Sequence, residues 1–475
     1  MTAPDREADL CWGQRYVWLN HHHLPTPARH EFNLTNSFEP QPGATVETLR
    51  QTIDLMVRRH ESLRTTYHRA TPTGPVPGPV QRVHPPAPVE LTCFDAADPA
   101  SVAAMRAFVT EPFRLEEQLP FRAGVSCRDG VPTLLTIVGH HASMDDWSIE
   151  ALKRESAEIH AAIVAGRAIT LAPVRQQPVD LARRESAPDA QAANRRALGI
   201  WARELARVPA DLFGPRRDPA AADGTPFSVS LSSPAALVAA RTLAAGHRVW
   251  PSSVYLATLT ALLAGYTGSG SVPVLVYQGN RDSAVHAGTL TCLFLPVLVH
   301  VDCQGDPSFT DLVRRTDERA REAADNSYFA YDQAVEITAR QAAARGMGLR
   351  LGTVVNQLRY PYLVRGGQRT IVTRNQRPDS WSLLPEDVYL RLSEWKDCLV
   401  LTLNARPEVI SPADGERLLR GFEALLLGQA AAGAPVHCSQ VAALAGFTPR
   451  PVATARRAVV GTSLVDLDRT GAELA

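Results

Sequence analysis

The sequence predicts an α+β protein made of two halves that meet at a shared seam. Both halves of the 475 residues contain segments with the apolar spacing of helices and segments rich in β-branched residues. Between them, residues 165–195 are rich in Gly, Pro, Gln, Arg and Ala and have little apolar period, which makes them the best internal boundary. At 45% hydrophobic and 21% charged, a chain of this length can bury a large core without disulfides or structural metals.

In the first half, apolar residues recur every three or four positions over 44–59 and over 146–164, which predicts two amphipathic helices. Residues 122–127 and 132–139 have the composition of strands, and the second of these is rich in β-branched residues. The second half mixes both kinds of element. Its predicted helices are 196–207, 234–244, 252–266, 308–325 and 411–432, and its predicted strands are 272–278, 293–302, 350–356, 387–394 and 398–404.

These elements suggest three regions. We expect an N-terminal lobe over 1–182, a C-terminal lobe over 183–432, and a Pro/Ala/Arg-rich tail over 433–475. The tail favours a complete, free-standing protein.

The charge balance excludes a strong field toward nucleic acid or anionic membrane, since Lys+Arg and Asp+Glu each number 49. The seven cysteines are scattered without a CxxC or zinc-like spacing, which is typical of reduced thiols in a cytosolic protein. The N-terminus lacks the apolar core of a signal peptide, and the longest apolar run, 292–299, is too short to span a bilayer. The expected compartment is the cytoplasm.

The stretch "IVGHHASMDDWSIE", residues 137–150, carries the strongest sign of chemistry. His140 and His141 stand at the end of a predicted strand, where successive side chains point to opposite faces and cannot easily bind one metal. One imidazole can face a cavity as a general base, because its ordinary pKa of about 6.5 lies near the operating pH. The alternative is structural, with Asp145 or Asp146 capping the next helix beside two packed histidines.

Two blocks of sequence add context to this corner. Residues 140–148, "HHASMDDWS", resemble the HHxxxDGWS motif of condensation domains from nonribosomal peptide synthetases. Residues 58–67, "RRHESLRTTY", resemble the RHExLRTxF motif of the same family, and "LCWGQRYVWLN" is similar to its SxAQxRLWxL motif. The second half matches loosely, with "GNRDS" at 279–283 similar to the family's GRxxxE region. The resemblance covers roughly residues 10–430.

The resemblance implies a fold of two chloramphenicol-acetyltransferase-like lobes in a V-shaped pseudo-dimer with a central tunnel. It implies an acyltransferase that joins a carrier-bound acyl or aminoacyl thioester to an amine or hydroxyl acceptor. No cofactor or metal belongs to the chain itself, since phosphopantetheine is presented by partner carrier proteins, which would act in trans. We expect a monomer that binds small-molecule donors and acceptors, without nucleic acid or membrane.

The resemblance also assigns roles to residues of the corner. His141 corresponds to the histidine at the centre of the tunnel, which acts as general base or orients the nucleophile. Asp145 corresponds to a structural aspartate that pairs with an arginine of the RHExLRT block, here Arg64. His140 and Trp147 belong to the same supporting motif, as does Asp146. A late strand, "VVNQL" at 354–358, is similar to one whose asparagine, here Asn356, faces the substrate channel.

Asp146 departs from the family motif, which has glycine at this position. A noncatalytic branch, the X domain that recruits oxygenases, carries HRxxxDD. Three functions therefore stay open: a condensation enzyme, a silent platform of the same fold that recruits a partner enzyme or carrier, and an acyltransferase that uses coenzyme A.

Two further clusters have simpler interpretations. "NHHHLP", residues 20–25, is expected to be a solvated loop rather than a metal site. Four arginines at 314, 315, 319 and 321 could dock an acidic carrier, but a solvated helix face is the preferred interpretation.

Overall fold

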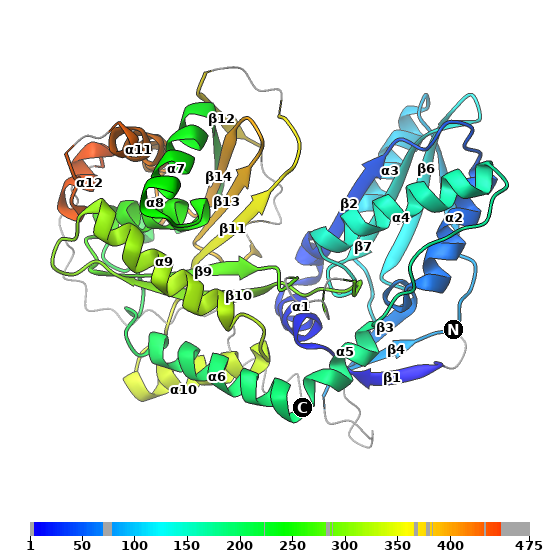
Figure 1. Ribbon diagram of the computed structural model, residues 1–475, viewed down its shortest axis with the longest axis horizontal. Helices are drawn as coiled ribbons and strands as arrows, with labels where there is room; N and C mark the ends of the chain where they lie inside the picture. The colour runs from blue at the N-terminus through cyan, green and yellow to red at the C-terminus, as the bar shows by residue number, and fades with distance from the viewer. Residues whose placement is uncertain are drawn as a thin grey trace.

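The protein consists of two lobes arranged in a V, joined at the base by α1 (Trp12–His23) and by the chain that runs from α5 (Pro178–Glu185) to α6 (Pro188–Leu205) (Figure 1). The computed structural model describes residues 4–69, 78–222, 224–281, 286, 288–364, 369–376, 381, 383–431 and 434–447. In this part of the chain, no helix is both long enough and apolar enough to cross a membrane.

The N-terminal lobe is built on a four-stranded sheet in the order β2-β7-β6-β5. Its strands are β2 (Asn33–Phe38), β5 (Leu91–Asp95), β6 (Phe121–Arg128) and β7 (Val131–His140). Two helices, α2 (Val46–Arg59) and α4 (Asp146–Val164), share an apolar cluster with Ala123 and Val125 of β6. Gly124 between them points to the other face, where a β-carbon would meet the phenyl rings that pack under α3 (Pro99–Thr110).

A small three-stranded sheet lies at the base of this lobe, in the order β1-β4-β3. It consists of β1 (Arg6–Asp9), β3 (Thr65–His68) and β4 (Val80–Val83). The RHExLRT block is the junction between this sheet and the helices: it ends α2, forms the 3-10 turn η2 (Glu61–Arg64) and begins β3. In this junction, the Glu61 carboxylate pairs with Arg6 of β1 at 2.8 Å, and His60 pairs with Glu155 of α4 at 2.7 Å.

The C-terminal lobe is built on a seven-stranded sheet in the order β10-β9-β11-β13-β14-β8-β12. Its strands are β8 (Phe227–Ser233), β9 (Ser271–Gln278), β10 (Leu295–Asp302), β11 (Thr353–Arg359), β12 (Ile371–Asn375), β13 (Val388–Glu394) and β14 (Leu399–Ala405). The helices that accompany it are α6, α7 (Pro234–His247), α8 (Pro251–Thr267), α9 (Phe309–Asp325), α10 (Tyr331–Arg345), α11 (Pro412–Ala430) and α12 (Cys438–Leu444).

One face of this sheet is apolar and the other is not. In β13, Leu390 and Leu392 are buried in the main core with the helices, whereas Arg391 between them is exposed on the opposite face. That second face looks toward the N-terminal lobe, so the sheet itself forms one wall of the space between the lobes (Figure 1).

The expected region boundaries need two corrections. A boundary after residue 182 would fall inside α5, whereas the chain changes lobe between Glu185 and Pro188. The expectation of a separate tail from residue 433 is wrong over its first residues, because Val441 of α12 and Phe447 are buried in the core of the C-terminal lobe. Residues 448–475 lie outside the described residues.

Candidate functional site

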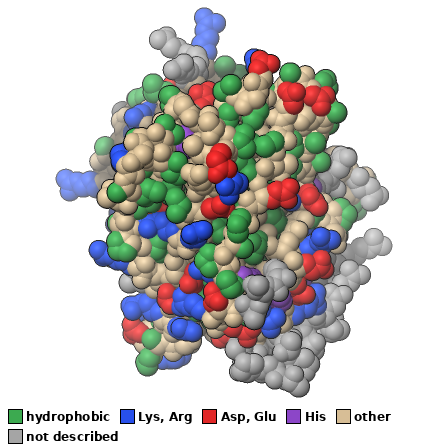
Figure 2. Space-filling view, turned by 90° about the vertical axis from the view of Figure 1, so that its right-hand side faces the viewer, with side chains coloured by type: hydrophobic (Ala, Val, Ile, Leu, Met, Phe, Trp, Pro, Cys, Tyr) green, Lys and Arg blue, Asp and Glu red, His purple; other side chains and the backbone are tan. Residues whose placement is uncertain are grey.

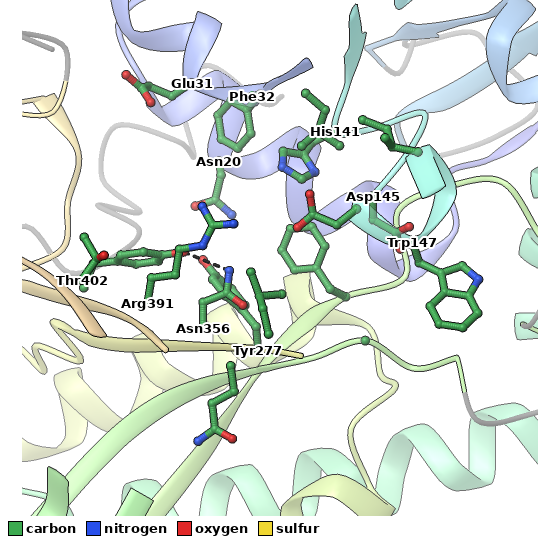
Figure 3. Close-up of a pocket in the computed structure, with 18 of the residues that line it drawn as sticks. Asn20, Glu31, Phe32, His141, Asp145, Trp147, Tyr277, Asn356, Arg391 and Thr402 are labelled. Atoms are coloured by element: carbon green, nitrogen blue, oxygen red, sulfur yellow. Dashed lines mark hydrogen bonds between the residues drawn. The ribbon is translucent and has the colours of Figure 1, made fainter. Parts of the chain in front are cut away.

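A cavity of about 1130 Å³ lies between the two lobes (Figure 3). Its N-terminal wall comes from α1, β2 and the corner between β7 and α4, and its C-terminal wall comes from β9, β11, β13 and β14. His141, Asp145, Asp146, Trp147 and Asn356 all line it. The structure therefore brings five of the seven expected site residues to one cavity, whereas His140 and Arg64 lie outside its lining.

The two histidines point to opposite sides, as the alternation of a strand requires. His140 is the last residue of β7 and is fully buried, while His141 reaches the cavity. The Nδ1 atom of His140 accepts a hydrogen bond from the backbone of Ala142 at 3.0 Å, so its Nε2 carries the proton. That N–H donates to Nδ1 of His21 in α1 at 3.0 Å. Two imidazoles thus connect the end of β7 to α1.

His21 overturns the expectation of a solvated loop over 20–25. Residues up to His23 belong to α1, and His21 is only 3% exposed. Burial, with the nearby His22 and Arg29, lowers the pKa of His21 to about 3, so it stays neutral at physiological pH. Burial also holds the pKa of His140 well below its ordinary value. The sequence offered no periodic signal for this pairing, because it joins two elements far apart in the chain.

The His141 imidazole packs edge-on against Phe294, with ring centroids 5.2 Å apart. Its Nδ1 is buried without a hydrogen-bond partner among the described residues, and the side chain lines the cavity. Burial lowers the pKa of His141, while the carboxylates of Asp146 and Asp145 partly oppose that shift. The imidazole is therefore neutral at pH 7 and can accept a proton.

Asp145 is the N-cap of α4 and the centre of a buried hydrogen-bond network. Its Oδ1 accepts from the backbone N–H of Ser148 at 2.9 Å and from the Ser148 hydroxyl at 2.8 Å. Both of its oxygens accept from Nη2 of Arg281 at 2.8 Å, and Oδ2 accepts from the backbone of Leu293 at 3.2 Å. Asp145 thus joins the corner of the N-terminal lobe to the segment between β9 and β10 of the other lobe.

The expected pairing of Asp145 with Arg64 is wrong. Arg64 lies in η2 and donates to the backbone carbonyl of His84, near Glu61 at 3.9 Å. The pair forms with Arg281 because the chain after β9 crosses to the N-terminal lobe and inserts that arginine beside the corner. The sequence contained a signal for this partner. Arg281 belongs to "GNRDS", which follows a predicted strand and is similar to a family motif.

Asp146 is exposed at the first position of α4, and within the described residues it makes no hydrogen bond or ion pair with His141. Its side chain does not close the imidazole off from the cavity. Trp147 is 51% exposed at the cavity wall, and its supporting role stays a prediction.

Asn356 lies on β11 and donates to the hydroxyl of Tyr389 at 3.0 Å (Figure 3). It is directly opposite Arg391 of β13 in the sheet, and Arg391 is opposite Thr402 of β14. These three residues form a polar row across the C-terminal wall of the cavity, and sequence reasoning missed Arg391 and Thr402.

Metal-ligating groups are not gathered at this site or elsewhere in the described chain, where no cluster of three or more His, Cys, Asp or Glu could hold an ion. All seven cysteines are free thiols, and burial raises the pKa of Cys11 and of Cys292 beside the corner. The arginines of α9 pair with groups nearby: Arg314 with Asp311, Arg315 with the Asp302 carbonyl, Arg319 with Glu322 and Arg321 with Asp317.

The sequence matches the family profile described as "Condensation domain" over residues 8–359. The chain belongs to the Condensation domain family. Chondramide synthase cmdD of Chondromyces crocatus is 28% identical over 300 residues, 61% of this chain and 8% of that protein. The isonitrile lipopeptide synthase of Mycobacterium tuberculosis is 29% identical over 354 residues, 71% of this chain and 14% of that protein. This condensation domain thus spans a small part of the length of the curated relatives it matches.

Solved structures of condensation domains share the fold. The first condensation domain of the calcium-dependent antibiotic synthetase, in complex with substrate analogue 3a, superposes with a TM-score of 0.66 at 19% identity, covering 92% of this chain and 99% of that one. The X-domain in the complex with OxyB from teicoplanin biosynthesis superposes with a TM-score of 0.70 at 20% identity, covering 93% and 96%. The SgcC5 protein from Streptomyces globisporus superposes with a TM-score of 0.66 at 17% identity, covering 90% of this chain and 100% of that one. The expected fold is therefore confirmed.

Proposed function

We propose that this condensation domain is an acyltransferase of nonribosomal peptide or related natural-product biosynthesis. It would join a carrier-bound acyl or aminoacyl thioester to an amine or hydroxyl acceptor. The observation that carries the proposal is the position of His141, whose imidazole lines the cavity between the lobes and has its pKa lowered by burial. Asp146 stands beside it without blocking it.

The proposed chemistry needs one group that accepts a proton as the acceptor attacks. Nε2 of His141 would take the proton of the amine or hydroxyl while the new C–N or C–O bond forms. The C–S bond then breaks, and the thiolate of the phosphopantetheine arm leaves with that proton. Asp145, held by Arg281, and His140, held by His21, would fix the backbone on either side of the base.

The carriers are proposed partners that act in trans, and the cavity is large enough at about 1130 Å³ for a small donor and acceptor together. The chain is proposed to act as a monomer, in the cytoplasm. It would need no cofactor beyond the phosphopantetheine on those carriers.

The second candidate is a silent platform that recruits a partner enzyme or carrier. Asp146 favours it, because this aspartate stands where the family motif has glycine. The X-domain neighbour was solved in a complex with OxyB, so a protein of this fold can hold an enzyme partner.

His141→Ala tests the proposal. The purified protein would be incubated with a panel of acyl-pantetheine thioesters and amine or hydroxyl acceptors, and products would be followed by mass spectrometry. We expect loss of at least about 100-fold in rate, the contribution of a general base, with an unchanged circular dichroism spectrum. His247→Ala, a histidine outside the cavity lining, should react like the wild type.

Near-normal product formation by His141→Ala would contradict the role of His141 as the general base. No product from the wild type, together with tight binding of carriers or partner enzymes, would favour the platform. The lowered pKa of His141 adds a second check. The acid limb of the rate profile should lie below the ordinary histidine pKa of about 6.5.

A further inference from the structure

The polar row on the C-terminal wall contains a cation that no part of the proposed mechanism uses. Directly opposite residues of a sheet point to the same face, so Asn356, Arg391 and Thr402 look into the cavity together. Figure 3 shows the Arg391 guanidinium rising from the sheet toward Asn20 of α1. Its Nη2 donates to the hydroxyl of Tyr360 at 2.8 Å, which holds the side chain in this direction.

Unlike Arg281 and Arg359, which also line the cavity, Arg391 has no carboxylate partner within the described residues. Arg281 pairs with Asp145, and Arg359 lies 3.7 Å from Glu394. Arg406 donates to the backbone carbonyl of Glu386 at 3.2 Å. Arg391 is exposed and, within the described ranges, makes no ion pair. An arginine in this state presents a fork of N–H groups that matches a carboxylate in shape and charge.

Asp146 supplies the opposite charge in the same cavity. It is exposed on the N-terminal wall, next to the imidazole, and is likewise not ion-paired in the described chain. Its carboxylate raises the pKa of His141 and also that of Arg391, so it lies within electrostatic reach of both. The cavity therefore holds a negative group beside the base and a positive group on the facing wall.

We propose that the acceptor is a free amino acid, bound with its carboxylate on Arg391 and its ammonium group between Asp146 and His141. This inference rests on the proposed function and names its acceptor class. A carrier-bound aminoacyl group has no carboxylate, because its carboxyl carbon is a neutral thioester. Apart from residues with a side-chain carboxylate, only an acceptor that is not attached to a carrier presents both charges. Asp146 stands where the family motif has glycine. It then becomes a residue that determines specificity for the acceptor.

The reaction balances without a further reactant. His141 takes one proton from the ammonium group, and the free amine attacks the thioester carbonyl. The C–N bond forms, the C–S bond breaks, and the thiol leaves with the proton from the imidazole. A second proton of the original ammonium group goes to solvent, and the product is an N-acyl amino acid that keeps its carboxylate on Arg391.

The binding test uses the twenty common amino acids and their primary amides, without any donor. Affinities would be measured by isothermal titration calorimetry for the wild type and for Arg391→Gln. We expect at least one amino acid to bind about tenfold or more tightly than its amide. Arg391→Gln should lower the affinity for the amino acid to that for its amide, and it should leave the affinity for the amide unchanged. Arg374→Gln, on β12 of the same sheet but outside the cavity lining, is the matched control.

Two results would overturn the inference: acids that bind no better than amides, or an acid affinity that Arg391→Gln leaves unchanged. Asp146→Asn separates the two charges. It should weaken the binding of the amino acid about tenfold. The binding of the corresponding des-amino acid, which has no ammonium group, should be unaffected. An equal loss for both ligands would contradict the assigned role of Asp146.

Turnover separates this inference from the proposed function. Product from aminoacyl-pantetheine acceptors but from no free amino acid would keep the condensation activity and overturn the acceptor class. If Arg391→Gln slows reactions with pantetheine thioesters as much as reactions with free acids, the guanidinium binds the arm instead, and the inference is overturned. No product from any acceptor would overturn the proposed function, while the binding test would still decide the amino acid site.

Discussion

Asp145 illustrates how strongly one buried carboxylate can constrain a site at the scale of single residues. Its side chain is 7% exposed and that of Arg281 is 8% exposed, so neither charge has water as an alternative partner. Asp145→Ala should lower the free energy of unfolding by about 3–5 kcal/mol, because Arg281 is left buried and unpaired. Chemical denaturation followed by circular dichroism measures the difference.

A double variant provides the control for this prediction. Asp145→Ala with Arg281→Met removes both charges and should recover part of the loss, since no unpaired ion remains. Asp146→Ala, which removes an exposed carboxylate one residue away, should change stability by less than about 1 kcal/mol. A wild-type denaturation curve for Asp145→Ala would contradict the buried pair.

At the scale of elements, α1 depends on a close approach that only glycine permits. A β-carbon on Gly13 would lie 2.1 Å from the Cys292 carbonyl oxygen, and backbone cannot move aside as a side chain can. Gly13→Ala should therefore cost about 1–3 kcal/mol through overpacking. It should also slow the reaction, because the same segment bonds to Ser148 and Asp145 at the corner.

Gly199 is the matched control for this substitution. It lies at an exposed position in the interior of α6, and a β-carbon added there would have no atom within 4 Å. Gly199→Ala should stabilise the protein by about 0.5–1 kcal/mol, since alanine loses less backbone freedom in a helix. If both variants behave alike in denaturant, the contact at Gly13 is not limiting.

Elements with a clear local period could be predicted from the sequence, and contacts between distant elements could not. The apolar spacing predicted α4 over 146–164 and α2 within two residues, and both are confirmed. The strands β8 and β12 and the helix α10 were missed, because their burial depends on neighbours far along the chain. The partner of Asp145 was mistaken for the same reason: Arg64 stands within a matched motif of the same lobe, whereas Arg281 reaches the corner only through the crossing after β9.

At the scale of the whole molecule, Glu185 makes a second buried contact between the two lobes, besides the pair of Asp145 with Arg281. The residue ends α5, where the chain leaves the N-terminal lobe. Its Oε2 accepts from the backbone N–H of Trp12 at 3.0 Å, and its Oε1 lies 2.5 Å from the hydroxyl of Tyr328 in the other lobe. Burial raises the pKa of Glu185 to about 8, against the hydrogen bonds and the nearby Arg15, which lower it. The carboxyl group is therefore protonated in the folded protein at neutral pH.

The sign of the pH dependence follows from that shift. The unfolded chain releases this proton near pH 4.3, whereas the folded chain keeps it up to about pH 8. Between these values the folded state binds more protons, so the contribution of Glu185 to stability is full below about pH 4 and is lost as the pH rises toward 8. Glu185→Gln keeps an uncharged group of the same shape at this position, and its amide can meet the same two partners.

Denaturation of wild type and Glu185→Gln at pH 5 and pH 8 tests this view of the junction. The variant should gain stability relative to the wild type between the two pH values, by an amount on the order of a few kcal/mol. Glu158→Gln, at an exposed position of α4, should keep a constant difference from the wild type. If the curves of Glu185→Gln and wild type stay parallel, the carboxyl group is already ionised at the junction. The lobes would then be joined through a buried charge that Arg15 compensates.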